Sequence, residues 1–326
     1  MTQAEILAAF PRYSALIVGD ICLDRRCTYD PAAAELSRET KIARLGVVAS
    51  EVSPGGGGTV GNNLASLGIT RLAVLGAIGE DGFGWELTRS LNSRGISTDL
   101  LVRASEVPTF TYTKLINAAT GEEDQPRVDF INTRPLPASV EKQVLIHLDN
   151  FAETFDVLFV SDQAETKQGG VVTPAVRDRL LKIAESNPEK VVWVDSRVRV
   201  ERFQKMILKP NEQEADAASI ALFGDVDYQR LRAHAGSRLM FVTKGVQGVL
   251  VVEDSSETLV PARAVQHPVD ICGAGDSFSA GAAMALAITG SATEAARFGN
   301  LVASITIMKH GTGTASPAEV LAAAHE

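Results

Sequence analysis

The chain has 326 residues, of which 45% are hydrophobic and 22% charged, as in ordinary globular proteins. Its net charge of −9 lacks the basic footprint that nucleic acids or anionic membranes require, so neither is expected as a partner. Three cysteines without a CxxC pair argue against a disulfide framework, and with no signal peptide or long apolar run visible they favour a cytoplasmic location.

The first predicted strand, 16–18, is apolar and ends at Gly19-Asp20, with Asp24 just beyond it. Ligands of open α/β sheets bind beyond the carboxyl ends of strands. Asp20 and Asp24 are therefore candidates for substrate contact, with Asp24 preferred, although both could be solvated loop acids. The following segment, 28–53, is interpreted as a loop with one or two strands outside the main sheet, ended by Pro54.

A run of four glycines, Gly55 to Gly58, opens a helix that is predicted to end at Gly68. The backbone of Gly56 and Gly57 is expected to let a ligand approach closely, because glycine has no side chain. The spacing also satisfies a dinucleotide-binding fingerprint. That motif needs a buried strand leading directly into the glycines, whereas Pro54 intervenes, so a dehydrogenase remains a distant alternative.

The remaining chain alternates between strands and helices. Runs 108–117 and 127–133 are typical of a hairpin, which with 28–53 would form a small β lid. After residue 137, predicted helices at 138–151, 173–186 and 227–236 alternate with strands at 157–160, 191–194, 206–208 and 239–242. This alternation predicts an α/β fold with a doubly wound, mostly parallel sheet and helices on both faces. Polar residues follow these strands: Asp162, Asp195, Asn211 and Thr243.

The stretch 270–276 is a glycine-containing turn that opens a small-residue, apolar helix at about 273–288, and a second helix is predicted at about 293–309. The first N–H groups of a helix have no internal partners, and together with the helix dipole they bind anions such as phosphate. Asp276, in the first turn, is placed to accept a proton from a hydroxyl that attacks a phosphoryl group. The alternative is an ordinary acid at a helix start with glycines that only permit packing.

Six motifs in order, along nearly the whole chain, resemble those of the ribokinase-like (PfkB-type) carbohydrate kinases. They are Asp24, the glycine run at 55–58, the loop at 76–84, Lys209-Pro210-Asn211 with Glu214, Thr243 to Gly248, and Asp270 to Asp276. Within the family, segments 19–25, 54–68, 108–109 and 127–130 most resemble the heptose 7-phosphate kinases. Two positions depart from the family pattern, since Thr59 replaces an Asn and Ile271 replaces a Thr.

The resemblance implies ATP-dependent phosphorylation of a sugar or sugar-phosphate hydroxyl, with heptose 7-phosphate as one candidate. It implies Asp276 as general base beside an anion hole of Gly273, Ala274 and Gly275. The implied substrate-binding residues are Asp24, Gly56, Gly57, Thr59 and Arg127. The implied ATP-binding residues are Lys209, Asn211, Thr243, Gly245, Gly248 and Asn300. Asn211 and Glu214 would hold Mg²⁺ through water, although Asn211 could instead simply cap the helix that follows it. The loop at 311–313 could serve a monovalent cation such as K⁺.

We expect one ribokinase-like domain over 1–326, with lid strands inserted at about 28–53 and 108–133. Exposed strand edges need covering, so a homodimer through the lid is expected. Two alternatives remain open: a nucleoside (adenosine-like) kinase, and a catalytically weak protein that senses a sugar phosphate. Thr59 and Ile271 lend weight to the second, and the identity of the sugar and of its reacting hydroxyl stays open.

Overall fold

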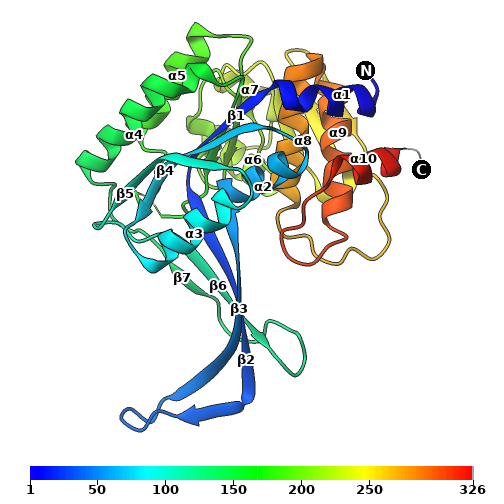
Figure 1. The fold of residues 1–326 in the computed structure, drawn as a ribbon. Coiled ribbons are helices and arrows are strands. Elements are labelled where there is room, and N and C mark those ends of the chain that lie inside the picture. Colours follow the sequence, from blue (N-terminus) through cyan, green and yellow to red (C-terminus); the bar gives the residue numbers. More distant parts are fainter. Residues whose placement is uncertain (167, 325–326) are drawn as a thin grey trace.

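The computed structural model describes residues 1–166 and 168–324, and in these residues nine strands form the main sheet (Figure 1). Their order is β13-β12-β11-β10-β9-β8-β1-β4-β5. The strands are β1 (Ser14–Gly19), β4 (Arg71–Gly79), β5 (Ser97–Ala104), β8 (Val157–Asp162), β9 (Val191–Ser196), β10 (Ile207–Leu208), β11 (Met240–Thr243), β12 (Val249–Val252) and β13 (Glu257–Val260). Neighbours pair in parallel except at β11–β12 and β12–β13, which are antiparallel.

Helices cover both faces of this sheet, which confirms the predicted fold class. Side chains of a strand alternate between faces, so in β1 Ala15 and Ile17 enter one core and Leu16 and Val18 the other. The first core is covered by α1 (Gln3–Ala9), α2 (Gly57–Ser66), α3 (Gly82–Asn92), α8 (Ala274–Thr289), α9 (Ala292–Thr306) and α10 (Pro317–Ala324). The second is covered by α4 (Ala138–Phe151), α5 (Pro174–Ser186), α6 (Glu212–Phe223) and α7 (Tyr228–His234).

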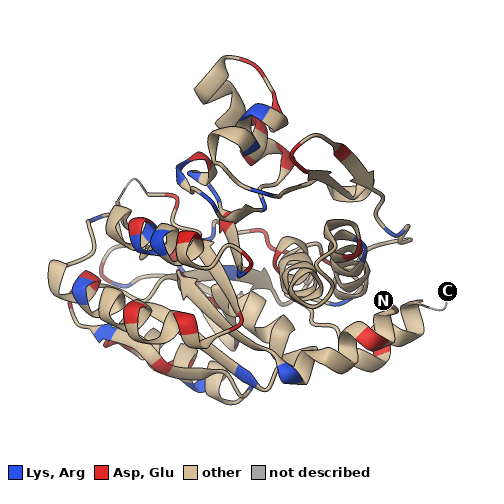
Figure 2. Ribbon diagram, turned by 90° about the horizontal axis from the view of Figure 1, so that it is seen from above, with Lys and Arg blue, Asp and Glu red and all other residues tan. Residues whose placement is uncertain are grey.

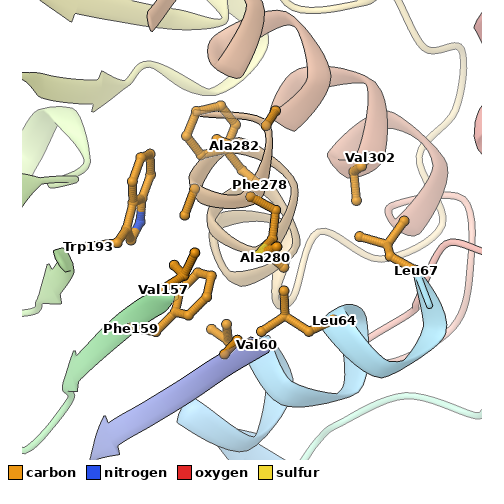
Figure 3. Close-up of a cluster of buried hydrophobic side chains, with 14 of the residues drawn as sticks. Val60, Leu64, Leu67, Val157, Phe159, Trp193, Phe278, Ala280, Ala282 and Val302 are labelled. Atoms are coloured by element: carbon orange, nitrogen blue, oxygen red, sulfur yellow. The ribbon is translucent and has the colours of Figure 1, made fainter. Parts of the chain in front are cut away.

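Helix α8 is the most deeply buried helix of the first core, as its small apolar composition predicts. All its residues from Ser277 to Leu286 are buried. Phe278 packs against the rings of Trp193 and Phe241, with ring centroids 6.3 and 6.5 Å away. Figure 3 shows Phe278 and its neighbours facing side chains from α2, β8 and β9. This packing fixes where the first turn of α8 meets the carboxyl edge of the sheet.

A second, four-stranded sheet has the order β3-β2-β6-β7. It consists of β2 (Ile21–Leu36), β3 (Ala43–Gly56), β6 (Thr111–Asn117) and β7 (Val128–Phe130). In Figure 1 the β2–β3 hairpin extends away from the main body. The expectation that Pro54 ends its strand is wrong, because Pro54 pairs with Leu23 inside β3. β3 is an edge strand, where a residue without an N–H is tolerated.

Two further boundaries differ from the prediction. Strand β13 was not anticipated, because three of its four residues are exposed and it shows no alternation of polar and apolar residues. Helix α9 ends at Thr306 rather than near Lys309. The carbonyl of Ile307, just past this end, accepts hydrogen bonds from Val269 and Asp270, so the chain there ties down the turn that precedes α8.

The chain reverses direction across the sheet beside β1. From β1 it continues to β4 and β5 on one side and then returns to β8 on the other. Such a switch point opens a crevice at the carboxyl ends of the strands, where ligands of doubly wound folds bind. The small sheet starts directly after β1, so it lies at the same edge.

The two chain ends lie on the same side of the molecule, where α1 packs against α10 (Figures 1 and 2). Figure 2 shows basic and acidic residues interspersed along the same helices and loops. Within the described part of the chain, no helix is both long and apolar enough to span a bilayer.

Gly19 offers a test of the β1–β8 junction. Its φ of +131° disfavours other residues, and an added Cβ would lie 2.2 Å from the Ser161 carbonyl oxygen. Gly19→Ala should therefore lower the free energy of unfolding by roughly 1–3 kcal/mol, as measured by urea denaturation. Gly82→Ala is the matched control, because nothing lies within 4 Å of its added Cβ. Equal stability of the two variants would contradict this account of the junction.

Candidate active site

A cavity of about 380 Å³ opens between the carboxyl edge of the main sheet and the small sheet. Six residues singled out from the sequence line it: Asp24, Gly56, Thr59, Arg127, Gly273 and Asp276. They come from the glycine run, from strands of the small sheet and their flanks, and from the first turn of α8. The structure thus brings together segments that lie far apart in the sequence.

The turn that opens α8 depends on Gly273 and Asp270. Gly273 adopts φ +77°, and an added Cβ would approach the methyl groups of Thr59 and Thr312 to 3.2 Å. The Asp270 carboxylate accepts the N–H of Cys272 at 2.9 Å and the N–H of Gly311 at 3.1 Å. These contacts join the turn to the loop after α9.

Asp276 lies in the first turn of α8 and is partly buried. Burial, reinforced by the Asp195 carboxylate and opposed by the Lys209 ammonium, raises the pKa of Asp276 to about 7. A carboxylate with a pKa near neutrality is a better proton acceptor than an ordinary one and is still about half ionised near pH 7. The geometry therefore suits Asp276 for proton abstraction from a bound hydroxyl.

Lys209 is buried beneath this turn. Its ammonium forms an ion pair of 2.5 Å with Asp195, and an added Cβ on Gly275 would lie 3.3 Å from its Nζ. The neighbouring carboxylates, led by Asp195, outweigh the effect of burial and raise the pKa of Lys209. A fixed positive charge thus lies next to the backbone of the first helical turn.

The Asp24 carboxylate lies directly against the backbone of Gly55. An added Cβ on Gly55 would lie 2.4 Å from Oδ1 of Asp24, so this glycine makes room for the carboxylate. Burial raises the pKa of Asp24 to about 6, although the positive charges of Lys114, Arg127 and Arg197 oppose the shift. Three cations therefore act on the carboxylate that was predicted to bind substrate.

Two predicted substrate contacts lie elsewhere. Asp20 is buried, and its carboxylate accepts three backbone N–H groups, so it is committed to the protein interior rather than the cavity. Gly57 is not among the lining residues; an added Cβ would lie 2.8 Å from Ile17 and Ile21. Gly57 allows α2 to pack on β1, which explains a glycine there without any ligand.

The two departures from the family pattern occupy different environments. Thr59 is buried, its hydroxyl donates to the Pro54 carbonyl at 3.3 Å, and its methyl group faces Gly273. Ile271 is 71% exposed, so its side chain is not part of the packed turn. Only Thr59 lines the cavity.

The predicted ATP-binding residues gather beyond the ends of β10 and β11. Thr243 forms an isolated parallel bridge with Asn211, and its N–H donates to the Pro210 carbonyl. Asn211 and Glu214 form a reciprocal capping box at the start of α6, with hydrogen bonds of 2.8 and 2.9 Å. The capping alternative considered for Asn211 is therefore realised, and one carboxylate oxygen of Glu214 is engaged in it.

The loop after Thr243 packs on the region that follows β13. Gly245 and Gly248 have φ of +55° and +104°, and an added Cβ on Gly248 would lie 2.2 Å from the Val260 carbonyl oxygen. The side-chain amide of Asn300 donates to the carbonyls of Val260 and Pro261 at 3.2 and 3.0 Å. Asn300 and Gly248 thus meet at the same segment.

Sequence reasoning missed several residues of the cavity lining, among them Lys114, Gln163 and Arg197. Arg197 follows Asp195 by two residues, but only acids and polar residues directly at strand ends were considered there. Lys114 lies within the alternating run 108–117, where a single lysine carries no distinctive signal. Gln163 directly follows Asp162 at the end of β8 and could have been found by extending the strand-end argument by one residue.

The strand order, the helices on both faces and the small sheet define a ribokinase-like fold. The ribokinase of Thermotoga maritima matches with a TM-score of 0.72, covering 96% of this chain and 100% of that structure. At 22% sequence identity this likeness shows the fold alone.

The sequence comparisons define the family. The family described as "pfkB family carbohydrate kinase" matches residues 23–319, so the chain belongs to it and is a phosphotransferase that acts on a sugar. The bifunctional protein HldE of Pelobacter propionicus is 30% identical over 331 residues, covering 98% of this chain. HldE of Trichlorobacter lovleyi is 28% identical over 332 residues, covering 99%. The chain spans only 66% of the length of each.

The raised pKa of Asp276 predicts a pH-dependent stability. The folded value of about 7 exceeds the unfolded value near 4, so the native state loses stability relative to the unfolded state as pH rises from about 4 to about 7, and the loss is complete above 7. Asp276→Asn removes this penalty and should stabilise the protein by on the order of 1 kcal/mol at pH 8. The gain in the free energy of unfolding, measured by urea denaturation, should be smaller at pH 5 than at pH 8. Exposed Asp178→Asn is the control, and a gain independent of pH would contradict the assignment.

Proposed function

We propose that this chain transfers the γ-phosphoryl group of ATP to a hydroxyl of a sugar that already carries a phosphate, with heptose 7-phosphate as the first candidate. One observation carries the proposal. Five basic side chains line the cavity that also contains Asp276, although the chain has a net charge of −9. They are Arg25, Arg26, Lys114, Arg127 and Arg197. Four acids also line the cavity, namely Asp24, Glu51, Asp270 and Asp276, so the basic side chains are in slight excess. In an acidic protein this excess favours an anionic substrate.

In the proposed reaction, Asp276 accepts the proton of the attacking hydroxyl while that oxygen forms a bond to the γ-phosphorus and the bond to ADP breaks. The N–H groups of Gly273, Ala274 and Gly275 stabilise the charge that develops on the transferred group, an effect typically worth a few kcal/mol. Asp24 accepts hydrogen bonds from other sugar hydroxyls. Lys209 adds a positive charge beneath the first turn of α8.

ATP and its Mg²⁺ are assigned to the residues beyond β10 and β11. Within the described residues, no three His, Cys, Asp or Glu side chains converge as metal ligands. The donors that do lie there, Asn211 and Glu214, provide the oxygen atoms that suit an ion which keeps several waters. Bound Mg²⁺ would neutralise phosphate charge. A monovalent cation such as K⁺ is assigned to the loop at 311–313, because Asp270 and Gly273 contact this loop beside the proposed anion hole.

The cavity favours this substrate class over the alternatives. An uncharged nucleoside could make no charge-assisted contact with the basic side chains of the lining, whereas a phosphate could, which speaks against an adenosine-like kinase. A weak sensor would be favoured by a damaged site, yet Ile271 is exposed and Thr59 is well packed. The motifs shared with heptose 7-phosphate kinases and the similarity to proteins named HldE support a heptose phosphate in particular.

The small sheet is proposed to mediate a homodimer. Its outer part exposes apolar side chains, among them Leu36, Ile42, Val47 and Val48. β3 is an edge strand whose backbone could pair with another copy. A second copy over this face would bury both the edge and these side chains.

The direct test is ADP production over a panel of sugars and sugar phosphates, with heptose 7-phosphate included. Wild type should turn over a sugar phosphate, with a rate that rises as pH passes through about 7, because ionised Asp276 is required. Asp276→Asn should keep ATP binding but lose on the order of a hundredfold or more in kcat. Near-normal turnover in that variant, or turnover of nucleosides alone, would sink the proposal.

The basic lining makes a separate prediction. Lys114→Ala and Arg197→Ala should each raise KM for the sugar phosphate on the order of tenfold, because a charge-assisted contact is lost. KM for ATP should change little. Arg44→Ala is the control, since Arg44 pairs with Glu35 on the outer hairpin. If both variants bind the sugar phosphate as wild type does, the lining is not a phosphate site.

A further inference from the structure

The segment after β8, residues 163–166 and 168–171, is held in place by the buried carboxylate of Asp20. Asp20 accepts the N–H groups of Gln163 and Ala164 at 2.9 Å through one oxygen, and that of Val171 at 2.8 Å through the other. Its carboxylate also packs against Gly170, where an added Cβ would lie 3.3 Å from the nearer oxygen. Asp20 therefore holds the beginning and the end of this segment together.

A second buried acid holds the middle of the segment. Asp162 forms an ion pair of 2.5 Å with Arg199, and this guanidinium donates to the carbonyls of Ala164 and Thr166 at 3.0 Å. Both side chains are at least nine-tenths buried. Such a network is rigid because each partner would be left unsatisfied if the segment moved away.

The backbone of Asp20 adds two further connections. Its N–H donates to the Ser161 carbonyl at 2.8 Å, and its carbonyl accepts the N–H of Gly57 at 3.0 Å. One residue therefore joins the end of β1, the end of β8 and the start of α2. The catalytic steps proposed above do not use its side chain.

The anchored segment carries part of the cavity lining. Gln163 lines the cavity and donates to the Asp195 carbonyl at 3.4 Å. Glu165 forms an ion pair of 2.6 Å with Arg197, which also lines the cavity, and the N–H of Arg197 donates to the Asp162 carbonyl. The positions of Gln163 and Arg197 thus depend on how the segment is held.

We propose that Asp20 is a positioning residue for acceptor binding: by anchoring the segment after β8 it fixes Gln163 and Arg197 against the sugar-phosphate substrate. The assignment of the substrate rests on the proposed function, whereas the anchoring rests only on the contacts described. Asp20 would then act on the affinity for the acceptor and not on ATP, whose proposed residues lie beyond β10 and β11.

Asp20→Asn tests the anchor, because the amide keeps the shape but places an NH₂ group against a backbone N–H. Hydrogen–deuterium exchange should be faster at the amides of Gln163, Ala164 and Val171 than in wild type. Gly170→Ala would place a Cβ 2.9 Å from the Cβ of Ala164 and 3.3 Å from the Asp20 carboxylate, so it crowds both the segment and its anchor without changing a charge. It should give the same pattern if Asp20→Asn fails to fold. Asp156→Asn is the control, since Asp156 accepts the N–H of Ser14 at the opposite end of β1.

The kinetic arm uses the best acceptor found in the ADP screen. Asp20→Asn should raise KM for this acceptor on the order of tenfold, the scale of one unsatisfied buried donor, while KM for ATP stays within about twofold. Unchanged exchange overturns the anchor. Faster exchange with an unchanged acceptor KM overturns its role in binding. A wild type that phosphorylates no sugar overturns the proposed function instead, and the exchange result still decides the anchor.

Discussion

The close contact between α8 and α9 is the constraint on which the site depends. An added Cβ on Gly281 would lie 2.9 Å from Val302, and one on Gly299 would lie 2.7 Å from the Phe278 ring. Two glycines therefore let the helices approach more closely than larger residues would permit. With α8 locked in this way and buried on all sides, its first turn has one position relative to the sheet. The packing therefore also fixes the positions of the N–H groups and the carboxylate of that turn.

The same burial sets the electrostatics of the site. A carboxylate at a helix start is normally stabilised by the dipole, yet burial dominates at Asp276 and raises its pKa. The buried Lys209–Asp195 pair beside it supplies one charge of each sign at short range. A buried pair of this kind is weak evidence for stability, since desolvation offsets the attraction. Its place beneath the proposed anion hole gives a functional reason for its presence.

Much of this architecture could be predicted from local patterns. The alternation of strands and helices predicted the fold class, and the small-residue run after Gly273 predicted a buried helix. Sequence reasoning failed where distant contacts decide the outcome. Pro54 continues its strand only because β3 lies at an edge, and the glycine at position 55 reflects a carboxylate 31 residues earlier in the sequence. The local sequence around Lys114 or Arg197 likewise gives no sign that the two side chains line the same cavity, because they come from different sheets.

The distribution of charge within the cavity also indicates how a sugar phosphate would lie in it. Asp276 carries a raised pKa of about 7, so a phosphate dianion beside it would raise the cost of ionising it further. Lys114 lies on β6 and Arg127 directly precedes β7, so both belong to the small-sheet side of the cavity. A substrate with its phosphate toward the small sheet and its free hydroxyl toward α8 would place the phosphate near Lys114 and Arg127 and the hydroxyl near Asp276. In the proposed reaction, this orientation would separate the phosphate that is bound from the hydroxyl that reacts, and the small sheet would select the acceptor.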